Sequence, residues 1–244
     1  MPYKRYKEKF IALIPARKGS KSIKNKNLYK ISGKPLIYYT ILASKKSKIF
    51  DQIFVSSDSK EILNYSENQN VRTIMRPKKY SNDFSSANDV VKHFINQNNE
   101  LKKEDIIVYL QPTSPFRNYI DIKKSIKLFI KNSLKSLVSV KKTDVCIYKT
   151  LFINKKYLKT FFDEKKMTIS RQKVPTSYEA NGAIYIFKVK NFLKKKRFPI
   201  ENSIPFIMKG LKNLDIDEYK DLTFLKRNMK KLIKSKFNIL PILK

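Results

Sequence analysis

Short apolar runs alternate with segments of helical periodicity along the first 140 residues. Strand-forming apolar residues cluster at 10–14, 52–56, 71–75, 106–111 and 136–140. The intervening segments at 36–48, 60–68, 86–98 and 121–131 carry apolar residues at helical spacing. Parallel strands need helical crossovers, so this order predicts an α/β fold with a doubly wound, mostly parallel, Rossmann-like sheet.

The alternation stops after residue 140. We interpret residues 142–178 as an arm inserted into a single domain that spans residues 1–244. A basic helix is expected within the arm at 155–162. After the arm, the pattern predicts a strong strand at 182–188, short strands at 204–208 and 213–216, and a closing helix at 217–234.

Composition excludes several classes of protein. Apolar residues make up 41% of the 244-residue chain, which is enough for a sizeable core, yet no run approaches the roughly 18 residues of a membrane span. The first ten residues lack the apolar region of a secretory signal, so we expect a cytoplasmic protein without membrane contact. One cysteine and one histidine disfavour a disulfide framework, a zinc site and a Ser-His-Asp triad.

The formal net charge of +34 has two interpretations. It fits a nucleic-acid-binding protein, or it reflects a drift of composition towards lysine. The lysines are spread along the chain, whereas nucleic-acid-binding proteins usually concentrate charge in a patch or tail. We therefore expect no nucleic-acid partner. In either case the charge favours phosphate-bearing ligands and predicts salt-sensitive binding.

A cationic loop follows the first predicted strand. Arg17, Lys21 and Lys26 come within ten residues of one another, directly after the apolar run Phe10–Ile14. In α/β proteins such loops lie at the carboxyl end of the sheet, where anionic ligands bind. The three cations suit a triphosphate, since arginine can bind two phosphate oxygens and lysine supplies a point charge. A solvated basic loop is the alternative.

Two further strand ends carry polar residues. The segment 76–86, RPKKYSNDFSS, offers an arginine, a carboxylate and hydroxyls, and it also fits a turn with a helix cap. In LQPTSPFR, residues 110–117, two prolines fix a turn and leave Gln111, Thr113 and Ser114 to face a cleft. A simple turn is the alternative for this second motif.

The segment LDIDEYKDL, residues 214–222, concentrates carboxylates in a chain with only 20 acidic residues. Asp215 and Asp217 are two apart, so on a strand they point to the same face. Two carboxylates together with phosphate oxygens suit Mg²⁺, which prefers octahedral oxygen ligands. The alternative is a charge pair at the start of a helix, with Asp217 as its cap.

These motifs in this order resemble the acylneuraminate cytidylyltransferase family, which comprises CMP-sialic acid synthetases and the pseudaminic and legionaminic acid cytidylyltransferases. The resemblance covers residues 10–233 and rests on PAR, GSK, KN, SGKPLIYYTI, LQPTSPFR, NGAIYI and the D-x-D-x-x-x-D-L pattern. It implies the sheet of nucleotide-diphospho-sugar transferases and a homodimer joined by the arm. It also implies Mg²⁺-dependent transfer from CTP to a nine-carbon acidic sugar, which releases pyrophosphate.

The resemblance also implies roles for individual residues. Catalysis would involve Arg17, Lys21, Lys26, Asp215 and Asp217, the last two as metal ligands. The nucleotide would contact Ala16, Arg17, Lys26, Asn27, Arg76, Ser85 and Ser86. The sugar would contact Gln111, Tyr178, Asn181, Lys149 and Arg171, with Arg171 projecting into the neighbouring subunit's site. Arg117 and Asp221 would be structural.

The sequence departs from the family pattern within the cationic loop. Ser22 replaces a glycine, and Lys24 and Asn25 replace a proline and its neighbour, so the loop's charges are better defined than its conformation. Two alternatives remain open. One is a sibling enzyme that uses another acid sugar of the pseudaminic, legionaminic or Kdo type, or GTP, and the other is a nucleic-acid-binding protein.

Overall fold

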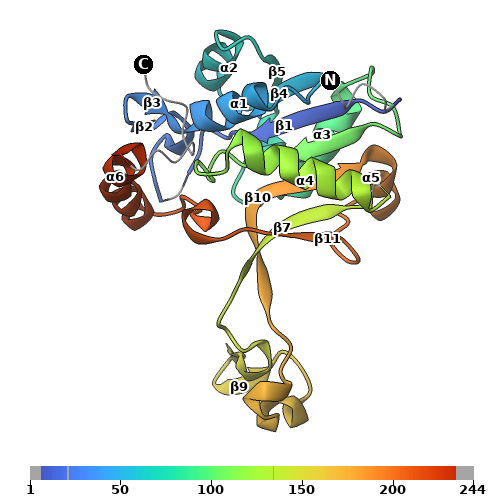
Figure 1. Ribbon diagram of the computed structural model, residues 1–244, viewed down its shortest axis with the longest axis vertical. Coiled ribbons are helices and arrows are strands. Elements are labelled where there is room, and N and C mark those ends of the chain that lie inside the picture. The colour runs from blue at the N-terminus through green and yellow to red at the C-terminus, as the bar shows by residue number, and fades with distance from the viewer. Residues whose placement is uncertain (1–6, 21, 134, 235–244) are drawn as a thin grey trace.

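The computed structural model describes residues 7–20, 22–133 and 135–234, without the side chains of residues 171 and 229–234. Within this part, seven strands form one central sheet (Figure 1). Their spatial order is β11 (Ile204–Ile207), β7 (Leu137–Lys142), β10 (Tyr178–Lys188), β6 (Ile106–Tyr109), β1 (Phe10–Pro15), β4 (Gln52–Ser57) and β5 (Arg72–Met75).

The sheet is mostly parallel, as the sequence predicts. Strand β1 pairs in parallel with both β4 and β6, β4 with β5, and β7 with β11. Only β10 among these strands runs antiparallel, against β6 and β7. The apolar run Phe10–Ile14 is buried at every position because β1 is covered on both faces.

Helices cover both faces of the sheet, which confirms the doubly wound fold (Figure 1). The helices are α1 (Leu36–Ser47), α2 (Lys60–Glu67), α3 (Ala87–Gln97), α4 (Tyr119–Lys131), α5 (Val189–Lys195) and α6 (Tyr219–Lys234). Helices α1, α2 and α4 share one core with alternate residues of β1, and α3 and α5 share the core on the opposite face. A third cluster packs α6 against the cationic loop and α1.

Local signals fix two of the helix starts. The side chain of Ser59 accepts a hydrogen bond from the backbone N–H of Ile62 at the start of α2. Ser86 and Asp89 form a reciprocal capping box at the start of α3. Serine is a favoured residue type at helix N-caps, and such caps stabilise a helix by about 1 kcal/mol each.

Two expected elements in the second half are wrong. The basic helix expected at 155–162 is a hairpin of β8 (Leu151–Asn154) and β9 (Tyr157–Thr160), because Lys155 adopts a left-handed φ of 57° and turns the chain back. The strand expected at 213–216 is irregular and follows the 3-10 turn Gly210–Asn213. A backbone bond from Ile216 N–H to Thr113 C=O (2.8 Å) fixes it in place of a sheet ladder.

The arm, residues 142–178, leaves the sheet between β7 and β10 and extends well away from the body (Figure 1). The pairing of Tyr178 with Lys142 continues the β7–β10 ribbon to the base of the arm. Short 3-10 turns and the β8–β9 hairpin form its far end. A second small hairpin, β2 (Lys30–Ile31) with β3 (Lys34–Pro35), precedes α1.

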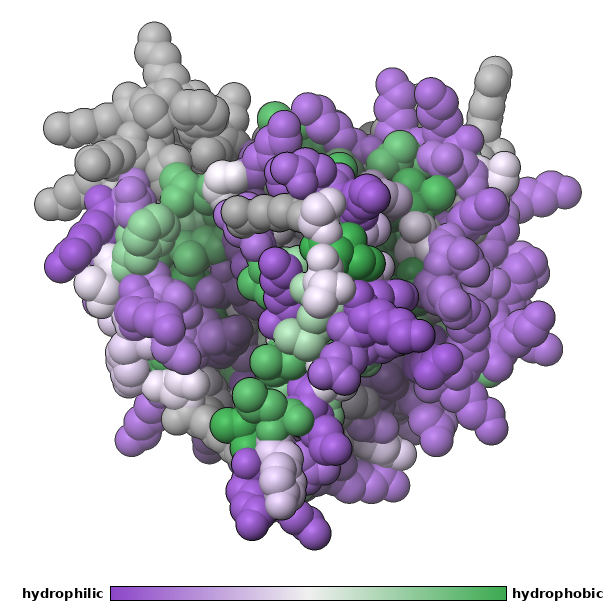
Figure 2. All heavy atoms as spheres, turned by 90° about the horizontal axis from the view of Figure 1, so that it is seen from below, coloured by the Kyte–Doolittle hydropathy of each residue, from purple (hydrophilic) through white to green (hydrophobic). Residues whose placement is uncertain are grey.

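Apolar side chains on the arm are largely exposed. Figure 2 looks onto the end of the arm and shows green apolar residues gathered along the middle of that face, between hydrophilic ones. The exposed apolar residues of the arm are Val145, Ile147, Leu151, Phe152, Ile153, Tyr157, Leu158, Phe161, Phe162 and Tyr178. Among the described residues, none of the helices has both the length and the apolar character that a membrane crossing requires.

Candidate active site

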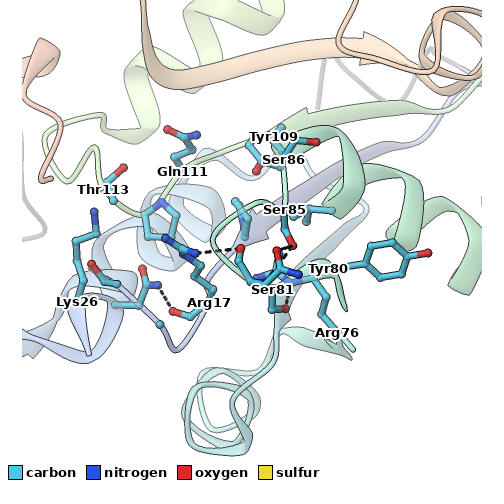
Figure 3. Close-up of a pocket in the computed structure, with 18 of the residues that line it drawn as sticks. Arg17, Lys26, Arg76, Tyr80, Ser81, Ser85, Ser86, Tyr109, Gln111 and Thr113 are labelled. Atoms are coloured by element: carbon cyan, nitrogen blue, oxygen red, sulfur yellow. Dashed lines mark hydrogen bonds between the residues drawn. The ribbon is translucent and has the colours of Figure 1, made fainter. Parts of the chain in front are cut away.

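The carboxyl ends of β1, β5 and β6 gather three polar loops around a cavity of about 380 Å³, called here the first cavity (Figure 3). Its lining includes Lys26 and Thr113 at one end, Arg76 and Tyr80 at the other, and Arg17 between them. This edge of a parallel sheet is the usual ligand site of doubly wound proteins.

The cationic loop is anchored at both ends. Lys18 donates its backbone N–H to the Asp58 carboxylate (2.8 Å), and Asn27 donates its side-chain amide to the Arg17 carbonyl (2.9 Å). These bonds orient the Arg17 side chain into the first cavity. Ala16 is fully buried and is not among the residues that line the cavity.

Two cations of the cavity are paired with carboxylates from distant segments. Arg17 Nη1 lies 3.1 Å from Asp83 Oδ1. Lys26 Nζ lies 2.9 Å from Asp217 Oδ1 and also donates to the Ile216 carbonyl (2.8 Å). Arg17 and Lys26, two of the three cations expected to bind phosphate, therefore line the cavity, and each has an acidic partner.

Arg76 forms the opposite end of the cavity. Its side chain is buried, and Nε donates to Ser81 Oγ (2.9 Å). Burial lowers the pKa of the Arg76 guanidinium from its usual value. Ser85 and Ser86 also line the cavity, but their hydroxyls donate to Asn82 and Asp89 within the loop and the capping box.

The end of β6 brings Gln111 and Thr113 to the cavity, as the sequence predicts for the QPTSP turn. Ser114 is buried and does not line the cavity, so its expected position is wrong. Arg117 is fully buried and donates to Thr40 Oγ1 (2.6 Å) and to the Gln111 carbonyl (3.1 Å). Burial lowers the pKa of Arg117 to about 10. These contacts agree with a structural role for this arginine.

A second cavity, also of about 380 Å³, lies beside the first. Asp215 and Asp217 line both cavities. The other residues of the second cavity are Lys141, Glu179, Ala180, Asn181, Asn213, Leu214, Glu218, Lys220 and Asp221. The carboxylates of Asp215 and Asp217 thus form a wall that the two cavities share. Asp221 itself accepts the backbone N–H groups of Asp217 and Glu218 (2.9 and 2.8 Å) at the start of α6, which agrees with a structural role.

The carboxylates of the shared wall fit a divalent cation. Asp215 Oδ1 is buried and has no hydrogen-bond partner among the described residues. Burial raises the pKa of Asp215, a bond from Thr113 lowers it, and Asp217 raises it. A cation at this position would satisfy the unpaired oxygen and offset both raising effects. The described residues contain no cluster of three or more acidic, His or Cys ligands, so phosphate oxygens and water would supply the remaining ligands.

The expected geometry of this acidic pair is corrected in one respect. Asp215 and Asp217 lie on an irregular segment before α6, which begins at Tyr219, and do not share the face of a strand. Asp215 is largely buried, whereas the side chain of Asp217 is 68% exposed. The fold brings them to the shared wall through loop geometry.

The residues expected to bind the sugar are dispersed. Asn181 lines the second cavity, but its side chain is already hydrogen-bonded within the protein. Its Oδ1 accepts from Ser139 Oγ (2.6 Å), and its Nδ2 donates to Asn213 Oδ1 (3.0 Å). Tyr178 and Lys149 are exposed on the arm and line neither cavity. The side chain of Arg171 and the whole of Lys21 lie outside the described residues.

Several lining residues were not predicted as binding residues. Tyr109 ends β6 on the α3 side of the sheet and lines the first cavity, as does Gln111 two positions later. That spacing was available as a signal. Tyr80 and Ser81 lie within the RPKKYSNDFSS segment, but no spacing rule separates their roles from that of a turn.

A doubly wound sheet with cations and carboxylates gathered at its carboxyl edge is typical of a nucleotide-binding α/β enzyme. The family model described as cytidylyltransferase matches residues 11–236, and the chain belongs to this family of nucleotidyltransferases.

Curated relatives agree with this family. The chain is 31% identical over 214 residues to N-acylneuraminate cytidylyltransferase of Escherichia coli O18:K1:H7, covering 87% of this chain and 50% of that protein. It is 31% identical over 220 residues to pseudaminic acid cytidylyltransferase of Campylobacter jejuni subsp. jejuni serotype O:2, covering 89% of this chain and 95% of that protein. The chain thus spans half the length of the first relative and nearly all of the second.

Solved structures share the fold at low sequence identity. CMP:2-keto-3-deoxy-manno-octonic acid synthetase, complexed with CTP, aligns with a TM-score of 0.67 at 15% identity, over 92% of this chain and 99% of that one. 4-diphosphocytidyl-2C-methyl-D-erythritol synthase from Anaerococcus prevotii aligns with a TM-score of 0.64 at 14% identity, over 91% and 99%.

Proposed function

We propose that the chain transfers a cytidylyl group from CTP to a nonulosonic acid, giving a CMP-sugar and pyrophosphate with the help of Mg²⁺. The main support is that Asp215 and Asp217 lie between two cavities of similar volume and line both of them. A nucleotide in the first cavity and an acid sugar in the second would meet at these carboxylates. The names of the relatives support this assignment, since they act on sialic and pseudaminic acids.

The arrangement suits an in-line displacement at phosphorus. The anomeric hydroxyl oxygen of the sugar would bond to the α-phosphorus, the bond to the pyrophosphate oxygen would break, and the hydroxyl proton would pass to a carboxylate or to water. Arg17 and Lys26 would neutralise the phosphate oxygens. Mg²⁺ on Asp215 and Asp217 would polarise the α-phosphate and lower the pKa of the hydroxyl.

We infer that the arm joins two copies of the chain. Its exposed apolar residues support this, because a monomer rarely leaves so many apolar side chains open to water. Lys149 lines neither cavity of its own chain, so this cation, together with Arg171 from the same arm, would serve the partner's sugar site. A sugar carboxylate is a suitable ligand for such cations.

The test is pyrophosphate release with Mg²⁺, crossing CTP and GTP against a panel of nonulosonic acids. Release with CTP and one acid would establish the reaction and identify the sugar. Release with GTP alone would keep the reaction type and change the nucleotide. Folded protein that releases no pyrophosphate with any pair, yet binds DNA or RNA, would contradict the proposal and favour the nucleic-acid alternative.

A further inference from the structure

Lys26 connects the cationic loop to the acidic segment before α6. Its ammonium group donates to the Ile216 carbonyl (2.8 Å) and lies 2.9 Å from Asp217 Oδ1. The Lys26 side chain is only 14% exposed, whereas that of Asp217 is 68% exposed. The lysine is therefore held in place while its carboxylate partner can turn into solvent.

The proposed function gives both groups other partners. A triphosphate in the first cavity needs Lys26, and a divalent cation at the shared wall needs Asp217. Asp217 Oδ1 binds a metal ion more weakly while it also accepts from the Lys26 ammonium. The two cations compete for the same lone pairs and repel each other. The two pairings are thus in competition.

The cost of exchanging partners is small. Ion pairs with one exposed member contribute at most about 1 kcal/mol, because water solvates the released carboxylate. After release, the Ile216 carbonyl still holds the Lys26 ammonium at the edge of the first cavity. The lysine can then turn its remaining N–H donors to phosphate without leaving its position.

We propose, on the basis of the proposed function, that Lys26 is an exchangeable partner of Asp217. It neutralises Asp217 until a divalent cation takes the carboxylate, and its ammonium then becomes fully available to the triphosphate. Binding of metal and binding of nucleotide are thereby coupled through this one ion pair, and the coupling is reciprocal. Lys26 acts as a positioning residue for the acidic segment as well as a phosphate ligand.

The test is a double-mutant cycle on CTP binding, measured by calorimetry in EDTA so that no metal contributes. We expect Asp217→Asn to bind metal-free CTP about threefold to fivefold more tightly than wild type, because it releases Lys26. In a Lys26→Met background the same substitution should gain less than about half of that factor. Glu218→Gln is the matched control, since its carboxylate pairs with Lys220 (2.7 Å).

Three outcomes would overturn the exchange of partners between Lys26 and Asp217. An equal gain from Asp217→Asn in both backgrounds would mean that Asp217 acts only through its charge, and would overturn the inference. So would an equal gain from Glu218→Gln, or no gain from Asp217→Asn. Failure of every folded variant to bind CTP even with Mg²⁺ would instead contradict the proposed function.

The reciprocal measurement is Mn²⁺ binding to the nucleotide-free protein, followed by the electron paramagnetic resonance signal of free Mn²⁺. Lys26→Met should bind Mn²⁺ about threefold to fivefold more tightly, since the competing ammonium is gone. Lys24→Met removes an exposed charge from the same loop and should change the affinity much less. Equal effects of the two substitutions would overturn the exchange.

Discussion

The body and the arm treat their apolar side chains in opposite ways. In the body, apolar residues from both faces of the sheet form continuous buried clusters. In the arm, Phe152 and Leu158 are 40% and 66% exposed. The body is a finished core within one chain, and it carries both cavities. The arm buries too little apolar surface to offset the conformational entropy that its chain loses on folding. The contrast supports the proposal that the arm packs against a second copy of the chain.

The largest effect should come from the wall that both cavities share. Asp217→Ala removes an exposed carboxylate, so the protein should fold normally while turnover falls about a hundredfold or more. Pyrophosphate release at saturating Mg²⁺ measures the loss, and a thermal melt checks folding. Glu61→Ala removes an exposed carboxylate from the first turn of α2 that lines neither cavity, and it serves as the control. Turnover like wild type would contradict the assignment of Asp217 as a metal ligand.

A glycine in the body gives the next largest effect. Gly182 has a φ of +75°, and a Cβ there would lie 2.3 Å from Gln111 Oε1 and 3.3 Å from Asp215 Oδ2. Gly182→Ala should therefore displace Gln111 in the first cavity and crowd Asp215 at the shared wall, and so lower turnover about tenfold or more, with a loss of about 1–3 kcal/mol in unfolding free energy. Pyrophosphate release and chemical denaturation measure the two effects.

Gly33→Ala separates backbone strain from this steric clash. Gly33 has a similar φ of +79°, and a Cβ there would meet nothing within 4 Å. The Gly33→Ala protein should lose stability through a similar backbone strain but keep its turnover. Equal turnover losses in the two variants would mean that the close approach at Gln111 has no catalytic consequence.

The sequence predicts the structure of the body better than that of the arm. The strand and helix alternation predicts the body because each apolar run, such as Phe10–Ile14, carries its own periodicity and ends at a proline or cap. The helix expected at 155–162 is wrong, since the basic and apolar residues of that segment fit both periods and only the backbone turn at Lys155 produces the β8–β9 hairpin. Local sequence does not encode such a turn strongly.

Within the site, sequence predicts residue types better than their geometry. Arg17, Lys26 and Gln111 reach the first cavity because strand ends converge at one edge of a parallel sheet. The Lys26–Asp217 pair spans 191 positions along the chain, and no local pattern indicates it. Asn181 matches the family motif, but its internal hydrogen bonds appear only in the folded structure.

The arm should give a smaller effect that depends on concentration. Phe152→Asp with Leu158→Asp should convert a dimer to a monomer, because charges in an apolar interface are costly to bury. The KM for the acid sugar should then rise about tenfold, while the Kd for CTP changes little. Analytical ultracentrifugation and calorimetry measure these.

Ile200→Asp is the matched control for the arm, since Ile200 is an exposed apolar residue (56%) on the body. It should change neither the association state nor the KM. A dimer that survives the two arm substitutions, or a fully active monomer, would show that the arm does not complete the site of a partner.

The smallest effect concerns the body alone, since the chain's one histidine is His93 on α3 and the arm has none. His93 is buried against Tyr80, and burial, with Arg76 and Lys79 nearby, lowers its pKa. The unfolded chain then binds a proton below about pH 6.5 that the folded body does not, so stability falls as pH falls through that range.

His93→Gln should flatten the change in Tm between pH 7.5 and 5.5. The corresponding change in unfolding free energy is about 1 kcal/mol or less. Thermal melts at both pH values measure it, with the double arm variant as the matched comparison. An arm variant that abolished the slope, or a His93→Gln protein that kept it, would assign the acid sensitivity to the interface and contradict this account.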